Sequence, residues 1–546
     1  MANAACSGGD AGIALTLEEE RMPNGIKNGI PRRRQICLAV AVIGATAAAT
    51  ACGSSSSVKS TGAAASTAVS IGTNADPAAF GYDPAALSGG GETTFWQGLY
   101  SSLFTTTSVG AVEPQLATSY TFNADKTVLT LQLRQGVKFT DGTTLTSTLV
   151  KQNLDRRSDP TLGAYGMFAA GGTAAIVSVA APSPSTVVIT FAKSQASAPS
   201  LLADDAGRIV GGKAIANPKS LMTQPDGSGP YTLSASGTVK GSSYTLAKNT
   251  SAWDASSFPY SRVVFKVLQD SQTMANALVS GQVQVAQLDP SVISFVKSKD
   301  SVVEFAGTIY ASPLFDKLGK TSEPFASVKV RQALSMAVNR AAIAKLHPGA
   351  VATASFFPPG TQGYDSNLDT TYAYNPAKAK RLLAEAGYPH GFSFSVITVG
   401  PQMDTDLQAL QQDWQAIDVH MTIQHATSYA EGLQAQSTTP IGYNDFTIGR
   451  DPLGFVNAFL LGGTFNPQHA TDAQITSALQ VAESEGGNSD TAALKSLDDA
   501  VVNEGWMFTF YAQPAEIGYD SSQVQVPKSS GASVFPLLSS VAPAGA

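Results

Sequence analysis

A run of alternating residues followed by two tight-turn signals is the feature that most restricts the fold of this chain. Leucines alternate with polar residues over residues 128–133, which is the pattern of a strand with one buried face. The turn signals Gln135-Gly136 and Asp141-Gly142 lie on either side of a predicted short strand at residues 137–139. Thr146 follows at a position where its side chain can cap a helix. This stretch therefore predicts an antiparallel β-meander that leads into a helix.

The order of these pieces resembles the extracytoplasmic substrate-binding lipoproteins of ABC importers, in the oligopeptide, dipeptide and nickel class. In that family a P-x-L-A-x-S-W turn leads into a D-G-x-x-Y-T-F-x-L-R-x-G-V-K-F-x-D-G-x-P hairpin. This chain departs from the pattern with Tyr120 in place of the Trp, Lys126 in place of a Gly, and Ser147-Thr148 in place of an Ala-Glu pair. The matching residues are Pro114, Leu116, Ala117, Ser119, Leu133, Arg134, Gly136, Val137, Lys138, Phe139, Asp141 and Gly142.

Further blocks extend the resemblance over about residues 69–519. Gly227-Ser228-Gly229-Pro230-Tyr231 resembles the G-T-G-P-Y turn of the family and predicts a turn into an edge strand. In residues 375–389, Asn375 caps a predicted helix, Pro376 is its first residue and Gly387 ends it. The spacing of apolar residues over 328–340 predicts a helix with a single apolar face. Its apolar positions are Val330, Ala333, Leu334, Ala337, Val338 and Ala341.

Composition limits the classes of function. The 546 residues are 43% hydrophobic, which is enough for a large core in two to four domains. The net charge is −7, and residues 1–52 carry five basic and four acidic side chains, so the rest of the chain carries a charge of about −8. An acidic body argues against a nucleic-acid partner. The three cysteines are Cys6, Cys37 and Cys52, so a disulfide framework and a cysteine-ligated zinc site are excluded for the body.

The first 52 residues predict a signal peptide. Arg32-Arg33-Arg34 precede a short apolar run at residues 36–49, which is too short to span a bilayer. Small residues then lead to Cys52, and this arrangement resembles a bacterial lipobox, whose cysteine carries a diacylglyceryl group. The alternative is cleavage by ordinary signal peptidase, in which case Cys52 carries no lipid and has no role. Sec and twin-arginine export both stay open, as do Met1 and Met22 as the start, and residues 53–66 predict a flexible tether.

Three aromatic residues are candidates for ligand contact. Phe95 and Trp96 lie in an apolar segment with helical spacing, and the corresponding segment of the family borders the ligand cleft near the domain crossover. Tyr310 lies in the strand predicted at residues 302–314, where the resemblance implies the first crossing into a second lobe. The alternative for Phe95 and Trp96 is that both rings belong to the core.

Residues 443–466 cover the place where the family shows a W-x-x-D-Y-x-D-P segment. In peptide-binding members the Asp before the Tyr captures the α-amino group of the peptide. Here only Asp451-Pro452 matches, and that Asp has no clear counterpart. Arg450 instead offers a planar cation for a carboxylate or phosphate. The alternative is that Arg450 and Asp451 form a surface pair that contributes little.

Catalytic motifs are not evident in the sequence. The five histidines show no metal-ligand spacing, and we find neither a G-x-S-x-G elbow nor a P-loop. We therefore expect no enzyme, no metal and no cofactor. Alternatives are an exported hydrolase and a lipid-anchored sensor ectodomain on the same fold.

The resemblance implies a two-lobe α/β fold like that of periplasmic binding proteins, with mixed sheets, two crossover strands and an enlarged first lobe. We expect lobe 1 at residues 67–307, with an inserted subdomain at about 97–224, lobe 2 at 308–505, and a return to lobe 1 at 506–546. The implied function is capture of a small solute, such as a peptide or peptide-like compound, and its delivery to ABC permease subunits. A monomer, anchored by lipid to the outer face of the cytoplasmic membrane, is expected.

Overall fold

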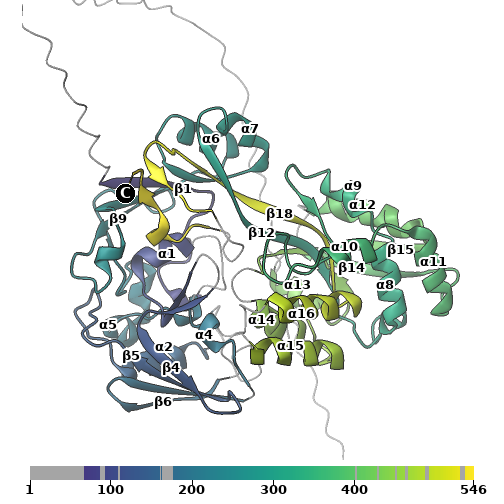
Figure 1. The fold of residues 1–546 in the computed structure, drawn as a ribbon, viewed down its shortest axis with the longest axis horizontal. Helices are drawn as coiled ribbons and strands as arrows, with labels where there is room; N and C mark the ends of the chain where they lie inside the picture. Colours follow the sequence, from purple (N-terminus) through teal and green to yellow (C-terminus); the bar gives the residue numbers. More distant parts are fainter. Residues whose placement is uncertain are drawn as a thin grey trace, which may run out of the picture. The chain divides into compact units, whose positions relative to one another are not determined.

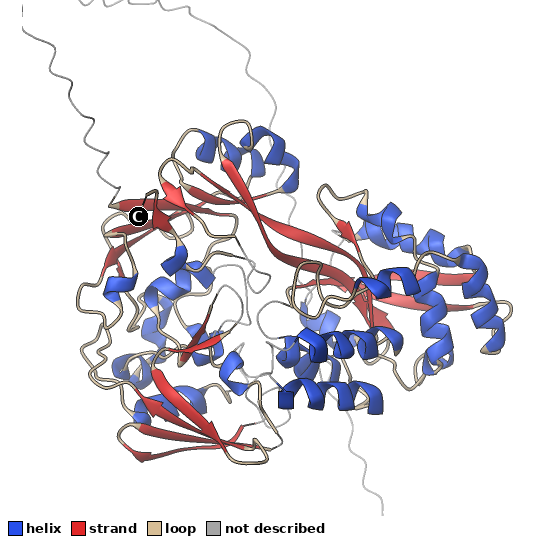
Figure 2. Ribbon diagram, viewed as in Figure 1, coloured by secondary structure: helices blue, strands red, loops and turns tan. Residues whose placement is uncertain are grey.

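The computed structural model describes residues 67–545, apart from residues 87–92, 108–110, 160–161, 163–175, 193, 204, 400–402, 427–428, 449–451, 462–464, 486–490 and 529–534. The chain has a mixed α/β fold in which helices pack around several sheets (Figures 1 and 2). The predicted signal peptide, Cys52 and the predicted tether lie outside the described residues.

The largest sheet among the described residues contains nine strands. They are β1 (Ala68–Thr73), β8 (Tyr231–Leu233), β9 (Ser243–Lys248), β10 (Arg262–Val267), β11 (Val285–Leu288), β12 (Ser301–Pro313), β13 (Val351–Ala352), β17 (Asn444–Phe446) and β18 (Met507–Tyr519). Their order is β17-β12-β18-β11-β1-β10-β9-β8, and β13 pairs with β18. β1 pairs in parallel with β10 and β11, so crossover connections join these strands, and the one between β10 and β11 contains the helix at Ser271–Val279. Val69 and Ile71 point inward at the spacing that a half-buried strand requires.

A four-stranded antiparallel sheet confirms the predicted strand at residues 128–133 and its hairpin partner. The predicted meander is only partly right, because the second neighbour of this strand is a strand at residues 186–191 and not the next one along the chain. The sheet contains β4 (Ala117–Phe122), β5 (Val128–Leu133), β6 (Ile176–Ser183) and β7 (Thr186–Phe191), in the order β4-β5-β7-β6. Leu129 and Leu131 are fully buried, as the alternation predicts. The short strand predicted at residues 137–139 is wrong, because only an isolated bridge joins Lys138 to Thr144 there.

The helix predicted after the meander is confirmed as α2 (Ser147–Arg156). The side chain of Thr146 accepts a hydrogen bond of 3.2 Å from the backbone N–H of Leu149, so Thr146 is its N-cap. The remaining short elements around these two sheets are α1 (Thr93–Leu99), α4 (Ala198–Leu201), α5 (Gly212–Ala216), α6 (Ser271–Val279), α7 (Ile293–Val296), β2 (Phe104–Thr106), β3 (Val112–Pro114), β19 (Val524–Gln525) and β20 (Ala542–Pro543).

A three-stranded parallel sheet and a group of helices form most of residues 328–503. The strands are β14 (Phe392–Val399), β15 (Val419–Ala426) and β16 (Ile441–Gly442), in the order β15-β14-β16. The helices are α8 (Val328–Met336), α9 (Arg340–Ala344), α10 (Ser366–Thr371), α11 (Pro376–Glu385), α12 (Asp404–Gln415), α13 (Tyr429–Ala435), α14 (Pro452–Phe455), α15 (Ala473–Glu485) and α16 (Thr491–Asn503).

The single helical face predicted over residues 328–340 is partly wrong. The apolar positions up to Val338 are buried, but α8 ends at Met336 and Ala341 is exposed at the start of α9. The break has a clear cause at Asn339, whose side chain accepts from the N–H of Ala342 and caps the new helix. The backbone N–H of Asn339 donates to Asp413 at 2.7 Å, a partner that the local pattern does not reveal.

The helix predicted over residues 376–386 is confirmed as α11. Asn375 accepts from the N–H of Lys378 at 2.9 Å, and Pro376 is the first helical residue. Gly387 has a φ of +96°, a conformation that side chains rarely adopt, so it ends the helix as expected.

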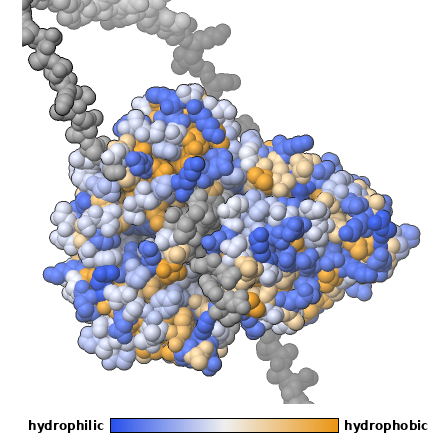
Figure 3. All heavy atoms as spheres, in the orientation of Figure 1, coloured by the Kyte–Doolittle hydropathy of each residue, from blue (hydrophilic) through white to orange (hydrophobic). Residues whose placement is uncertain are grey.

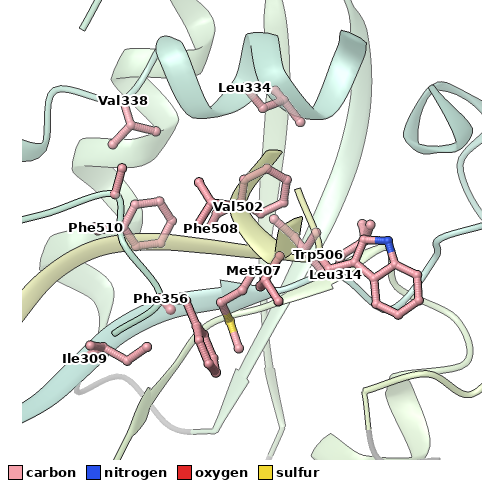
Figure 4. Packing of buried hydrophobic residues seen from close by; sticks show 14 of the residues in the cluster. Ile309, Leu314, Leu334, Val338, Phe356, Val502, Trp506, Met507, Phe508 and Phe510 are labelled. Atoms are coloured by element: carbon pink, nitrogen blue, oxygen red, sulfur yellow. The ribbon is translucent and has the colours of Figure 1, made fainter. Parts of the chain in front are cut away.

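The buried apolar side chains of the described residues fall into separate clusters. We call the cluster between Ile309 and Ala512 the second core, and the three clusters within residues 69–305 and 517–541 the first cores. Side chains from β12, β18, α8 and α16 meet in the second core (Figure 4). β12 and β18 contribute side chains to the second core and to one of the first cores, so these two strands join them.

The surface mixes polar and apolar residues. On the face drawn in Figure 3, apolar residues occur in scattered groups among polar ones. Among the described residues, Phe80 is the most exposed of the large apolar side chains, at 78%. No helix in the part of the chain that the structure describes combines the length and apolar character needed to cross a bilayer.

Candidate functional site

The candidate site is built on β12 and β18, because these strands carry the chain between the first cores and the second core. They pair antiparallel, with register shifts between Phe305 and Thr308 and between Tyr310 and Ala311. Gly307 lies at the first shift, where an added Cβ would be only 1.8 Å from the carbonyl oxygen of Gln513. Glycine therefore lets the two backbones approach closely here. Such bulges bend strands and change the direction of the side chains beside them.

Tyr310 lies between the two register shifts and belongs to a stack of aromatic rings. Its ring lies parallel to that of Tyr511 on β18, with 4.5 Å between the centroids and 12° between the planes. The ring of His347, which follows α9, stacks on Tyr511 at 4.7 Å and 17°. We call these three residues the aromatic stack. It fixes the direction of Tyr310 by contacts on a ring face, the arrangement in which aromatic pairs gain energy beyond burial.

Asp406 holds this stack from helix α12. Its Oδ2 accepts from the hydroxyl of Tyr443 at 2.6 Å and from that of Tyr511 at 2.8 Å. Its Oδ1 is 2.6 Å from Nε2 of His347. The Asp406 side chain is 3% exposed and that of His347 is 31% exposed. A buried carboxylate is stable only when partners of this kind surround it. We call Asp406, Tyr443, Tyr511 and His347 the Asp406 cluster.

The protonation of the two phenols follows from their surroundings. Burial raises the pKa of Tyr511 far above its usual value, and the negative charge of Asp406 raises it further. The same two causes, in the same order, raise the pKa of Tyr443. Both hydroxyls therefore keep their protons at neutral pH and act as donors to the carboxylate. Burial also raises the pKa of Tyr310, with Asp445 and then Asp406 adding to the effect.

We call residues 447–451, which contain Arg450 and Asp451, the candidate ligand loop. The strand β17 directly precedes it and pairs with β12 in the nine-stranded sheet. Asp445 of β17 is the register partner of Tyr310, and the hydroxyls of Thr308 and Thr447 are 3.3 Å apart. Arg450 and Asp451 follow, and both lie outside the described residues. The chain continues through α14 into a π-helix at Val456–Leu461, a form that is frequent at functional sites.

An aromatic cluster fastens both sides of this loop to the second core. The ring of Phe446, before the loop, packs edge-on against those of Phe455 at 5.8 Å and Phe465 at 5.4 Å. Phe459 of the π-helix lies 4.7 Å from Phe455. The segments that lead into and out of the loop are thus held by apolar contacts.

The predicted residues Phe95 and Trp96 lie elsewhere, in α1 among the first cores. They are 1% and 2% exposed, and Phe95 packs edge-on against Phe265 at 5.2 Å. Trp96 stacks on Tyr100 at 5.7 Å, but its buried Nε1–H has no hydrogen-bond partner in the described part of the chain. Their role in ligand contact stays a prediction. The structure does not bring them together with Tyr310 through any contact among the described residues.

The glycines of the predicted turn explain how α1 is positioned. A Cβ at Gly227 would lie 2.0 Å from the carbonyl oxygen of Leu99, and one at Gly229 would meet the same backbone. The N–H of Gly229 donates to that carbonyl at 3.1 Å. The turn leads into β8, an edge strand of the described sheet, so the predicted turn and edge strand are confirmed.

Comparison with known proteins decides the family. A family profile described as bacterial extracellular solute-binding proteins, family 5 Middle, matches residues 111–466, more than half of the chain. The chain belongs to this family of solute-binding proteins.

Relatives and solved structures agree with this assignment. The glutathione-binding protein GsiB of Escherichia coli (strain K12) is 31% identical over 299 residues, which are 54% of this chain and 57% of that protein. This chain therefore spans little more than half of the length of the curated relatives that it matches.

Two solved structures confirm the predicted two-lobe fold. The ABC transporter-associated periplasmic binding protein DppA from Helicobacter pylori, in complex with the peptide STSA, has a TM-score of 0.69 at 20% identity and covers 87% of this chain and 98% of its own. NikZ from Campylobacter jejuni, in complex with Ni(L-His), has a TM-score of 0.65 at 19% identity and covers 87% and 99%.

Sequence reasoning missed the Asp406 cluster of this solute-binding protein. Its members come from four places in the chain, between residues 347 and 511, so no local motif contains them. The available signal was weak: Asp406 is one of two acidic residues in the first turn of α12, and Tyr511 lies inside the long strand β18. Among the described residues, no three His, Cys, Asp or Glu side chains are grouped so as to hold a metal ion.

Proposed function

We propose that this protein is the solute-binding component of an ABC importer, which captures a peptide or peptide-like solute between two lobes and delivers it unchanged to a membrane permease. The observation that carries the proposal is the separation of the first cores from the second core, with β12 and β18 joining them. A chain built in this way can close by bending at the joining strands while each core stays intact. The family assignment supports the same function.

The proposed lobes follow from the same strands. Lobe 1 comprises residues 67–307, with its inserted subdomain at about 97–224. Lobe 2 comprises residues 308–505, and residues 506–546 return to lobe 1. Each of the two joining strands packs in one of the first cores at one end and in the second core at the other. Phe305 and Ile517 pack in the first cores, whereas Ile309 and Phe510 pack in the second core, which supports this division in outline.

The proposed solute carries a carboxylate and an amide or amine. The names and complexes of the relatives point to this class, since they involve glutathione, the peptide STSA and Ni(L-His). We expect Arg450 to form a two-point contact with the carboxylate, with Asp451 beside it. Tyr310 and the rings of Phe95 and Trp96 would supply apolar contact.

The remaining parts of the proposal concern the cell envelope. After export, Cys52 would carry a diacylglyceryl group that holds the monomer at the outer face of the cytoplasmic membrane. Residues 53–66 would act as the tether, and permease subunits would receive the solute. A binding role of this kind needs no covalent step, so we expect no enzymatic turnover.

Calorimetric titration tests the binding role. Glutathione, dipeptides, tripeptides and Ni(L-His) are titrated into the full chain, and the solute is then recovered and analysed. We expect one of these classes to bind and to be recovered unchanged. Arg450→Ala should weaken that binding by at least about tenfold, whereas Arg381→Ala, an exposed arginine on α11, should leave it unchanged. Equal affinities in both variants would remove Arg450 from the site, and chemical conversion of the solute would contradict the proposed role.

A further inference from the structure

The hairpin turn between β4 and β5 contains an unusual residue. Lys126 has a φ of +54°, in the left-handed region where a side chain is strained and glycine is favoured. The turn itself is well held, because the Oδ1 of Asn123 accepts from the N–H groups of Thr127 and Val128, each at 2.9 Å. The N–H of Lys126 donates to the carbonyl of Asn123 at 3.1 Å. Such a turn forms with glycine at least as well, so the lysine side chain needs an explanation of its own.

The side chain of Lys126 reaches a distant part of the chain. Its Nζ donates to the backbone carbonyl of Glu483 at 3.1 Å, across 357 residues of sequence. Glu483 lies in the last turn of α15, where the carbonyl groups lack partners within the helix. A helix C-terminus carries partial negative charge, so it favours an ammonium group. Lys126 is half-buried at this contact.

The contact connects the first cores with the second core. Lys126 follows a strand whose apolar residues belong to one of the first cores, and α15 packs in the second core. The Oε1 of Glu483 in turn accepts from Asn457 at 2.8 Å, and Asn457 lies in the π-helix that follows the candidate ligand loop. Lys126 is therefore coupled through Glu483 to the segment next to Arg450.

We propose that Lys126 is a latch that stabilises the closed arrangement of the two lobes. This inference rests on the proposed function, in which the lobes open and close around a solute. The ammonium group can meet the end of α15 only while the hairpin and the helix are adjacent, so the contact is made on closing and lost on opening. Glycine would form the turn without strain, but it has no ammonium group to contact the carbonyl of Glu483. Lysine is therefore retained at this position despite the strain.

Two variants separate the latch from the turn. Lys126→Met removes the ammonium group and keeps the strained side chain, whereas Lys126→Gly removes both. Lys240→Met, an exposed lysine in the turn before β9, is the matched control. Hydrogen exchange of the peptide that ends α15 should become roughly two- to fivefold faster in both Lys126 variants and stay unchanged in Lys240→Met. Lys126→Gly should unfold at a temperature no lower than the unmodified protein, which excludes misfolding as the cause.

Small-angle scattering of the ligand-free full chain gives the deciding result. We expect a larger radius of gyration for Lys126→Met and Lys126→Gly than for the unmodified protein and Lys240→Met. Equal radii, or unchanged exchange at the end of α15, would overturn the latch. Neither measurement uses a solute, so a failure of the proposed binding function would appear separately, as the absence of binding in the titrations.

Discussion

Replacing Asp406 by Ala tests whether the Asp406 cluster stabilises the fold of the second core. The substitution removes the acceptor of two buried phenol hydroxyls, those of Tyr443 and Tyr511, and the partner of His347. A buried donor left without an acceptor costs about 1–3 kcal/mol. Two such donors cost about 2–6 kcal/mol, and relief of the buried carboxylate offsets part of this. We therefore expect the free energy of unfolding to fall by about 3 kcal/mol.

The same helix offers a matched control. Asp404 lies two residues earlier on α12 and pairs with His425 at 2.6 Å, the same distance that joins Asp406 to His347. Both partners in that pair are exposed, at 33% for Asp404 and 41% for His425. An exposed pair contributes about 0–1 kcal/mol, so Asp404→Ala should change stability by no more than this.

Urea unfolding at pH 7, followed by far-ultraviolet circular dichroism, measures both variants. The contrast between two Asp–His pairs of equal length isolates burial and the two phenols as the cause. Tyr443→Phe and Tyr511→Phe should each cost about 1 kcal/mol, because each removes a donor and leaves a carboxylate that keeps other partners. A loss below about 1 kcal/mol for Asp406→Ala, or equal losses for Asp404→Ala and Asp406→Ala, would refute the reasoning.

Further predictions concern the joining strands and a buried acid. Gly307→Ala places a Cβ 1.8 Å from the carbonyl oxygen of Gln513. This clash should lower the free energy of unfolding by about 1–3 kcal/mol, measured by urea unfolding. An unchanged urea midpoint would show that β12 and β18 can move apart at this point without loss of stability. Burial raises the pKa of Asp254 to about 6, despite the opposing effect of Arg134. The folded state therefore holds this proton more tightly than the unfolded state, and its contribution to stability is present below the unfolded pKa of 3.8 and is lost as the pH rises to about 6. Asp254→Asn should remove that decline between pH 4 and 6, and an identical slope in the variant would contradict the assignment.

Local signals in the sequence predicted those elements whose determinants are local. The ends of α11 were predicted because Asn375, Pro376 and Gly387 each act within one turn of the helix. Strand β5 was predicted because Leu129 and Leu131 alternate with polar residues, and burial on one face needs only that alternation.

Other features depend on contacts between residues far apart in sequence. The break before α9 was missed because the N–H of Asn339 bonds to Asp413, 74 residues away. The Asp406 cluster was missed for the same reason, since its partners are separated by up to 105 residues from Asp406. Lys126 was noted only as a departure from the family pattern, and its partner Glu483 lies 357 residues further on.

The candidate ligand residues were predicted unevenly. Tyr310 lies on the joining strand expected for it, in a stack whose other members the sequence did not reveal. Phe95 and Trp96 pack inside the first cores, which agrees with the alternative that both rings are structural, and their role in binding stays a prediction. Arg450, Asp451 and Cys52 lie outside the described residues, so their roles are proposals.

Native mass spectrometry of the protein as purified from its own cells tests the central claim most directly. The account predicts one small peptide-like molecule per chain, which is released on denaturation with the same mass before and after long incubation with the protein. A chain that carries no such molecule and binds none of the titrated solutes, or one that returns the molecule cleaved or otherwise altered, would contradict it.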